Sequence, residues 1–331
     1  MVAGSGGLLA ACGGSGGGQG GSSEPVSVSV SHYPSLLYSV PWAVAIEQGF
    51  FEEREIKLDE IVGSSGGGTT VRNVVTGGLP IGAVATPAAI NAFNEGSGLK
   101  VLGGAIANTQ DISFVTLPEK GIKSIEDLRG KRVGFTEPGS VTQGCIVLSL
   151  QEAGIPLDEV ELQAMGGLSE ALTGLKEDAI DVAPQLLPIA FSTNEEEGFE
   201  TVFQTKEYVG DFAQLVMIAT EQSVSQQPEL LKSLIEIYQQ AIDFTLKDPE
   251  KAAAAWAKNS EVPEDDALKS LEAIDPSTYY STALTAESLN TAVREMREIE
   301  LLEEGDEVEW DDLLDQQFLP DDKQVDTAEL E

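Results

Sequence analysis

An alternation of apolar and polar residues marks the first regular element of the chain. The run VSVSVSHY, residues 26–33, has a period of two, which is typical of a half-buried β-strand. The run VPWAVAIEQGFF follows and carries Pro41 near its start and Gly49 near its end, the usual asymmetry of helix termini. The pattern therefore predicts a strand followed by a helix.

The same succession of strands and helices continues along the first half of the chain. Strands are predicted at 56–62, 80–85, 100–107, 112–117, 131–136, 161–165 and 180–184, and helices at 69–75, 86–96, 141–154 and 168–178. Ser124 and Asp127 have the spacing of a capping box. Strands that alternate with helices predict the α/β class, with mostly parallel sheets covered by helices on both faces.

Two extended segments, near residues 112–118 and 213–220, interrupt the alternation. They predict two sheets in two lobes, with these segments as the crossovers between them. From Gln227 onward the chain is predicted to be mostly helical, and PELLKSLIEIYQQAIDFTL has the pattern of an amphipathic helix that packs on the core. The apolar side chains of that helix are Leu230, Leu231, Leu234, Ile235, Tyr238, Ala241 and Ile242. A chain of 331 residues, 41% of them hydrophobic, is long enough for two such lobes.

The charge balance excludes one class of partner. Asp and Glu number 56 against 19 Lys and Arg, a formal net charge of −37. This field repels nucleic acid and anionic lipid surfaces, so we predict no nucleic-acid binding. Self-repulsion of this size is relieved by salt, because the Debye length falls to about 3 Å at 1 M. A protein from a saline environment and an ordinary acidic surface protein both fit the composition.

The stretch GLLAACGGSGGGQGGSS, residues 7–23, predicts a membrane anchor. Leu9, Ala10, Ala11 and Cys12 resemble a bacterial lipobox, in which the signal peptide is removed before a cysteine that is then lipidated. We predict a partial signal peptide at 1–11, then lipidated Cys12 and a flexible Gly/Ser tether over 12–25. The alternative is a tail with an incidental cysteine, since the stretch before Cys12 lacks the basic residues of a signal peptide. No apolar run approaches the length of a membrane span, so attachment would come through Cys12.

Loops rich in small residues follow five of the predicted strands. Ligands of open parallel sheets bind beyond the carboxyl ends of strands, where small residues let them approach the amides of the next helix. The loops are GSSGGGTT (63–70), TP (86–87), EPGSVTQG (137–144), GGLSE (166–170) and PQLLP (184–188). Each loop alone is equally well explained as a turn. GSSGGGTT lacks the ending of a P-loop and the spacing of a Rossmann fingerprint.

Residue types that carry catalysis are scarce. His32 is the single histidine, and a lone histidine beside a strand end is typically structural or a minor ligand contact. The two cysteines, Cys12 and Cys145, provide neither a structural disulfide nor a cysteine-based metal site. We therefore predict a binding protein without catalytic residues, metal or cofactor.

Several segments together resemble the substrate-binding proteins of ABC importers for alkanesulfonate, taurine, nitrate and thiamine precursors. The likeness covers most of residues 27–190, and EWDDLLDQQFL, residues 309–319, is similar to the closing helix of that family. The segments are VPWAVAIEQGFFEEREIKLDEIV, SSGGGTTVRNVVTGGLPIGAVATPAAINAFNEG, GIKSIEDLRGKRVGFTEPGS and LTGLKEDAIDVAP. The resemblance implies a type II periplasmic-binding fold with a ligand cleft between lobe 1 (27–115 and 213–331) and lobe 2 (116–212). It also implies a monomer on the outer face of the membrane, or in the periplasm, that delivers a small solute to a permease and its ATPase.

The resemblance also implies which residues bind the ligand. By position they are Tyr33, Ser35, Tyr38, Ser39, Ser64, Ser65, Thr69, Thr86, Ser140, Thr142 and Gln143. Gln110, Asp111 and Gln185 are added because they stand at predicted strand ends. Tyr33 and Tyr38 either stack on a planar ring or belong to the core.

The ligand is predicted to be a small nitrogen-bearing molecule, heteroaromatic or zwitterionic and sulfonate-like. The candidate loops contain no Lys or Arg, whereas Asp111 or Glu137 can accept a hydrogen bond from an amine or ring N–H. The alternative is an enzyme of cofactor-precursor synthesis on the same fold. The cysteine-rich motif of that enzyme is absent here.

Overall fold

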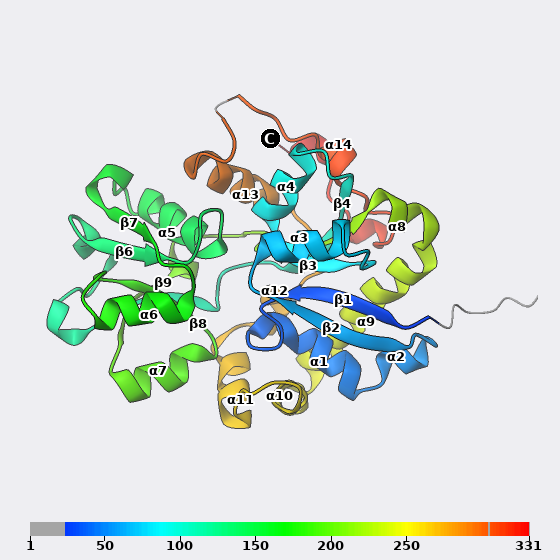
Figure 1. Cartoon of the computed structure of the whole chain (residues 1–331), viewed down its shortest axis with the longest axis horizontal. Helices are drawn as coiled ribbons and strands as arrows, with labels where there is room; N and C mark the ends of the chain where they lie inside the picture. Colours follow the sequence, from blue (N-terminus) through cyan, green and yellow to red (C-terminus); the bar gives the residue numbers. More distant parts are fainter. Residues whose placement is uncertain (1–23, 304, 331) are drawn as a thin grey trace, which may run out of the picture.

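The computed structural model describes residues 24–303 and 305–330, which form two α/β lobes (Figure 1). Lobe 1 is built on a five-stranded sheet in the order β2-β1-β3-β10-β4. These strands are β1 (Val26–Ser31), β2 (Leu58–Ser64), β3 (Gly82–Ala85), β4 (Leu99–Ile106) and β10 (Leu215–Thr220). Strand β1 pairs in parallel with β2 and β3, whereas β10 pairs antiparallel with β3 and β4.

Lobe 2 repeats this plan. Its strands are β5 (Ile112–Thr116), β6 (Arg132–Phe135), β7 (Glu161–Ala164), β8 (Ala183–Leu186) and β9 (Glu200–Gln204). Strand β5 pairs antiparallel with β8 and β9, and β6 pairs in parallel with β7. A bridge between Val133 and Val182 joins the two pieces in the order β7-β6-β8-β5-β9. In each lobe, the fourth strand in this order is the strand that the chain forms directly after it crosses from the other lobe. This strand is β10 in lobe 1 and β5 in lobe 2.

Helices cover the sheets and form most of the C-terminal third. Those before the second crossing are α1 (Val40–Glu47), α2 (Phe50–Glu53), α3 (Gly67–Val75), α4 (Thr86–Asn94), α5 (Val141–Glu152), α6 (Leu168–Lys176) and α7 (Ile189–Glu197). Those after it are α8 (Glu221–Gln226), α9 (Pro228–Lys247), α10 (Pro249–Lys258), α11 (Glu264–Ala273), α12 (Pro276–Tyr279), α13 (Ala286–Glu298) and α14 (Trp310–Leu313). Short 3-10 turns lie at Leu37–Ser39, Pro118–Lys120, Ile125–Leu128, Leu157–Glu159, Thr205–Glu207, Asp321–Lys323 and Thr327–Glu329. The capping box of Ser124 and Asp127 is confirmed.

The α/β class with two lobes is confirmed, but the crossovers lie elsewhere than predicted. Residues 112–118 and 213–220 contain β5 and β10, each of which is a strand inside the sheet that it has just entered. The chain crosses between lobes just before them, at 107–111 and 205–214. The boundary drawn from the sequence between residues 115 and 116 therefore moves to the residues before Ile112. A strand that enters from the opposite lobe runs against its neighbours, so the sheets are less uniformly parallel than predicted.

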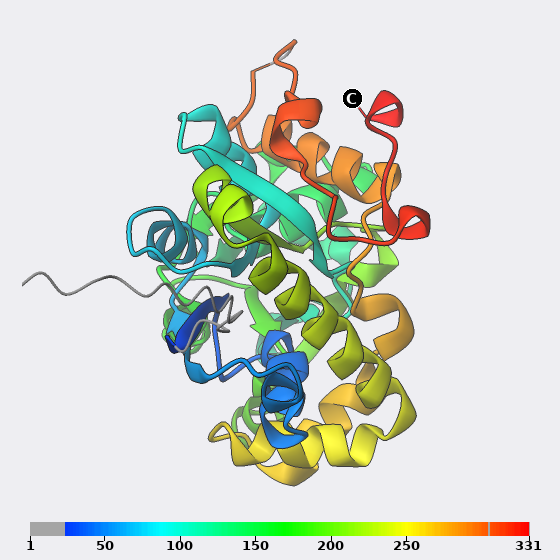
Figure 2. The ribbon, with the colours of Figure 1, turned by 90° about the vertical axis from the view of Figure 1, so that its right-hand side faces the viewer.

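The long amphipathic helix is confirmed as part of the core of lobe 1. Helix α9 packs along α1, and Figure 2 shows α9 and α10 in yellow-green and yellow along one side of the lobe. The rings of Trp42 and Tyr238 lie 5.1 Å apart, and the hydroxyl of Tyr238 donates to the carbonyl of Ala105 in β4 at 3.1 Å. The opposite face of the sheet is covered by α3, α4 and α13.

The closing helix predicted at 309–319 is a single turn. Only Trp310–Leu313 is helical, and Leu314 then forms a bridge with Val101 of β4. The extended segment covers the outer edge of β4, which would otherwise expose unpaired backbone groups. Main-chain pairing with a sheet edge therefore decides the shape of this segment.

Membrane attachment was predicted through Cys12 and not through a membrane-spanning helix. Within residues 24–303 and 305–330, no helix has the length and apolarity that a bilayer span requires. Cys12 and the predicted tether up to residue 23 lie outside the described residues.

Two leucines of α9 provide a matched test of this packing. Leu234 is fully buried, whereas Leu246 on the same helix is 45% exposed. We expect Leu234→Ala to lower the free energy of unfolding by about 2–5 kcal/mol, because it leaves a cavity in the core. Leu246→Ala should change it by less than about 0.5 kcal/mol. Urea unfolding followed by circular dichroism measures both, and equal losses would contradict the assignment of the buried face.

Candidate functional site

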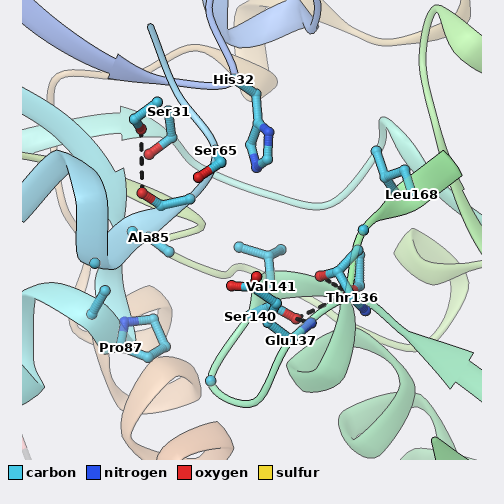
Figure 3. A pocket seen from close by; sticks show the side chains of 18 of the residues that line it. Ser31, His32, Ser65, Ala85, Pro87, Thr136, Glu137, Ser140, Val141 and Leu168 are labelled. Atoms are coloured by element: carbon cyan, nitrogen blue, oxygen red, sulfur yellow. Dashed lines mark hydrogen bonds between the residues drawn. The ribbon is translucent and has the colours of Figure 1, made fainter. Parts of the chain in front are cut away.

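A cavity of about 850 Å³ lies between the two lobes. Lobe 1 contributes the ends of β1 and β2, the start of α3 and one face of α4. Lobe 2 contributes the loops after β6 and β7 and the residues around β8 and α7. Figure 3 shows Ser31, His32, Ser65, Ala85 and Pro87 on one side and Thr136, Glu137, Ser140, Val141 and Leu168 on the other. The carboxyl ends of parallel strands from both lobes thus meet at one cavity.

The wall of lobe 1 carries a cluster of hydroxyl groups. The hydroxyl of Thr70 lies 2.8 Å from that of Ser31 and 2.6 Å from that of Ser64. These bonds tie the ends of β1 and β2 to the first turn of α3. Gly63 in β2 allows the loop after β1 to lie against the backbone of β2, because a Cβ at position 63 would lie 2.3 Å from the carbonyl oxygen of Tyr33. The hydroxyls are therefore held in place before any ligand arrives.

A second hydroxyl cluster faces it from lobe 2. The hydroxyl of Thr142 lies 2.9 Å from that of Thr136 and 3.0 Å from that of Ser140. The hydroxyl of Ser140 caps α5 by accepting a hydrogen bond from the backbone N–H of Gln143. Helices α3, α5 and α6 all begin at the cavity, and the free N–H groups of a helix start attract negative charge. The cavity thus combines hydroxyl groups with three positive helix ends.

The ionisable side chains that line the cavity are acidic or neutral. They include Glu95, Glu137 and Glu170, and no Lys or Arg is among the described residues of the lining. Glu137 reaches across from lobe 2, since a Cβ on Gly66 in lobe 1 would lie 4.0 Å from its Oε2. Burial lowers the pKa of His32, which keeps the imidazole neutral at neutral pH. Carboxylates therefore dominate the side-chain charge of the cavity.

The structure brings half of the predicted ligand-binding residues to this cavity. Those that line it are Tyr33, Ser35, Tyr38, Ser64, Ser65, Ser140 and Thr142. Those that do not are Ser39, Thr69, Thr86, Gln110, Asp111, Gln143 and Gln185.

The residues away from the cavity are engaged in the fold itself, with the exception of the half-buried Thr69. Thr86 donates to the carbonyl of Ala213 in the second crossing segment, and Gln110 donates to Thr278 of α12 at 3.0 Å. The amide of Gln185 donates to Thr193 at 2.6 Å and to Asn194 at 3.0 Å in α7. Gln143 accepts from the N–H of Gly139 at 2.7 Å, and Ser39 is fully buried. Neither a match to the family's ligand-binding positions nor a position at a strand end therefore sufficed to place these side chains in the cavity.

Sequence reasoning did not select several residues that line the cavity. Ser31, His32, Thr136, Ser169 and Glu170 line it without having been among the predicted ligand-binding residues, although Ser169 and Glu170 belong to the predicted loop 166–170. A usable signal existed for Ser31, which is the last residue of an alternating strand. His32 adopts a positive φ of 59°, and its backbone N–H donates to the carbonyl of Ser64 at 2.8 Å. This turn directs His32, Tyr33 and Ser35 into the cavity, and no sequence pattern predicted it.

A buried polar network joins the cavity wall to both crossing segments. The Nε2 of Gln214 donates to the hydroxyl of Tyr38 at 2.7 Å and to Oδ1 of Asp111 at 3.4 Å. Asp111 lies in the first crossing segment, Gln214 in the second, and Tyr38 in the wall. Burial raises the pKa of the Asp111 carboxyl to about 7, an effect that the hydroxyls of Tyr279 and Tyr38 and the amide of Gln214 only partly offset. Hydrogen bonds thereby tie both crossing segments to the cavity wall.

Across the part of the chain that the structure describes, no group of three or more His, Cys, Asp and Glu side chains has the geometry to hold a metal ion. What the cavity offers a ligand is hydrogen bonds, helix ends, aromatic surface and carboxylates.

Residues 37–252 match the model of the NMT1/THI5-like family, and the chain belongs to that family. A binding protein of Brucella abortus is 27% identical over 218 residues, which cover 65% of this chain and 66% of that protein. A thiamine biosynthesis protein of Haemophilus influenzae is 24% identical over 234 residues, 70% of this chain and 73% of that protein. The chain spans about two thirds of the length of the Brucella relative. The family resemblance drawn from the sequence is thus confirmed.

Solved structures confirm the type II periplasmic-binding fold. The aliphatic sulphonate binding protein SsuA from Escherichia coli is 16% identical with a TM-score of 0.69, over 84% of this chain and 86% of that one. The nitrate-binding protein NrtA from Synechocystis PCC 6803 is 14% identical with a TM-score of 0.70, over 89% and 86%. The desulfurization enzyme DSZB is 16% identical with a TM-score of 0.62, over 89% and 97%. Both binding proteins and an enzyme thus share this fold.

The pKa of Asp111 predicts how stability depends on pH. The folded protein holds this proton up to about pH 7, whereas the ordinary value is 3.8, so stability should fall as pH rises between these values. Asp111→Asn should remove that part of the pH dependence and raise the free energy of unfolding at pH 8 by up to about 4 kcal/mol. Urea unfolding at pH 4 to 8 measures it, with Asp59→Asn on the exposed side of β2 as control. An unchanged pH slope in Asp111→Asn would contradict the assignment.

Proposed function

We propose that this protein is the extracytoplasmic substrate-binding component of an ABC importer. The observation that carries the proposal is the cavity of about 850 Å³ between two lobes, lined on both sides by hydroxyl groups and helix starts. A solute that bonds to both walls favours the closed arrangement of the lobes by its differential affinity. The closed form then delivers the solute to a permease that works with an ATPase. The protein acts as a monomer, with Cys12 as its lipid anchor on the outer face of the membrane.

The solute of this proposal is a small nitrogen-bearing organic molecule. Glu137 and Glu170 can accept hydrogen bonds from an ammonium or ring N–H group, and the starts of α3, α5 and α6 can receive a sulfonate or carboxylate. These carboxylates would repel a purely anionic ligand. The described lining has no basic side chain that could offset this repulsion. A zwitterion or a neutral heteroaromatic ring satisfies both kinds of group.

Tyr33 is the aromatic residue suited to stack on such a ring. It is half-buried and lines the cavity. Tyr38 is only 4% exposed and accepts the hydrogen bond from Gln214, so its role is to form the wall. Of the two roles left open by the sequence, we therefore assign ligand stacking to Tyr33 and a place in the wall to Tyr38.

An enzyme of cofactor-precursor synthesis is the second candidate. The thiamine biosynthesis relative and the similar fold of DSZB favour it. The two candidates differ in turnover: the purified enzyme alone would convert its substrate, whereas a binding protein returns its ligand unchanged. Mass spectrometry of the ligand recovered after incubation separates them, and a new product formed in proportion to protein and time would overturn the transport proposal.

A ligand panel tests the proposed function directly. Thermal unfolding of the full chain in 1 M KCl is measured against alkanesulfonates, nitrate, aminopyrimidines, flavins and amino acids. A ligand at about 100 times its Kd stabilises the folded state by about 2.7 kcal/mol, which raises the melting temperature visibly. We expect shifts with amine-bearing or heteroaromatic members and none with nitrate. A shift with nitrate alone would contradict the proposed solute class.

Variants of Tyr33 test the stacking contact with whichever panel member binds. Tyr33→Ala should raise its Kd about tenfold, because an aromatic contact contributes about 0.5–1.5 kcal/mol beyond simple burial. Tyr33→Phe keeps the ring and should bind like the unmodified protein. Isothermal titration calorimetry gives both constants. A Kd raised equally in the two variants would assign the contact to the hydroxyl instead of the ring.

A further inference from the structure

A buried glutamate lies where the lobes touch outside the cavity. Helix α13 packs on lobe 1 through Leu289, Val293 and Met296, which belong to the same apolar cluster as β4 and β10 residues. The same helix also contacts α5 of lobe 2. Glu295 of α13 points at Gly144 of α5, since a Cβ at Gly144 would lie 1.7 Å from Oε1 of Glu295. The glutamate therefore occupies space that lobe 2 leaves open only because residue 144 is glycine.

This carboxyl has no polar partner. Glu295 is 0% exposed, and neither of its side-chain oxygens has a hydrogen-bond partner among the described residues. Ala292, one turn earlier on α13, packs with Leu148, Val209 and Phe212 in a small apolar cluster between the lobes. An ionised carboxylate in such surroundings is strongly disfavoured, and burial raises the pKa of Glu295 well above its ordinary value.

The ionisable groups around Glu295 leave it without a compensating charge. From α5 the facing group is Cys145, a buried thiol whose pKa is also raised by burial and by the nearby Glu295 and Asp111. On α13 itself, Arg294 is exposed to solvent, and on the second crossing segment Asp211 is exposed. No ion pair of the described residues includes Glu295. The packed state thus requires the neutral acid.

We propose that Glu295 is a proton-dependent latch between the lobes: the protonated carboxyl packed against Gly144 holds α13 on α5, and its ionisation releases lobe 2. When the lobes separate, water reaches the carboxyl and it ionises at its ordinary pKa. The packed state therefore binds one proton more than the separated state, so rising pH favours separation. The inference rests on the lobe motion of the proposed function but not on any ligand.

Small-angle X-ray scattering of the ligand-free full chain between pH 5 and 9 in 1 M KCl tests the latch. The radius of gyration of the unmodified protein should increase with pH as the lobes separate. Glu295→Gln keeps the shape without the charge, and the increase should be absent. Glu287→Gln removes an exposed carboxylate from the same helix and should behave like the unmodified protein. Circular dichroism of each sample reports whether the fold is intact.

Gly144→Ala tests the geometry independently. Its methyl group falls on the carboxyl position, so the protein should be expanded at every pH. Ser149→Ala, a buried position on the same helix, should leave the compact state unchanged. A radius that is constant with pH in the unmodified protein, or an equal increase in Glu295→Gln, would overturn the latch. Because no ligand is used, either result leaves the ligand panel free to decide the proposed function separately.

Discussion

The insertion of β10 between β3 and β4 is the constraint on which this molecule depends. The sheet of lobe 1 lacks its fourth strand until the chain has built lobe 2 and returned, since β10 begins at Leu215 and pairs with both neighbours. Strand β5 holds the same place in lobe 2. Main-chain hydrogen bonds in the middle of each sheet therefore fix the ends of both crossing segments. The lobes are held side by side by two short connections, and the cavity forms between them.

The same arrangement explains where the polar groups gather. Parallel strands end at one edge of each sheet, and the loops at those edges face each other across the cavity. The clusters around Thr70 and Thr142 come from different lobes but have the same chemistry, hydroxyls bonded to hydroxyls beside a helix start. Both walls of the cavity therefore offer hydroxyl groups beside a helix start.

Two buried acids lie where the two lobes meet. Asp111 links the two crossing segments to Tyr38 in the cavity wall, and Glu295 fills the contact between α13 and α5. Neither oxygen of Glu295 has a hydrogen-bond partner among the described residues, and burial of such a group costs free energy. In the proposed latch, protonation of Glu295 favours the packed arrangement of α13 and α5, so proton binding accompanies lobe closure.

The sequence by itself determined the α/β succession, the two-lobe organisation, the amphipathic α9 and the loops that meet at the cavity. Those features depend on local periodicity and on small residues, which neighbours along the chain reveal. The tertiary structure alone decided which side chains of those loops face the cavity. Thr86 and Gln185 stand at strand ends as predicted but bond to the second crossing segment and to α7, whereas Ser31 and His32 turn into the cavity. The contact of Glu295 with Gly144 joins residues of different lobes far apart in the chain, so only folding brings them together.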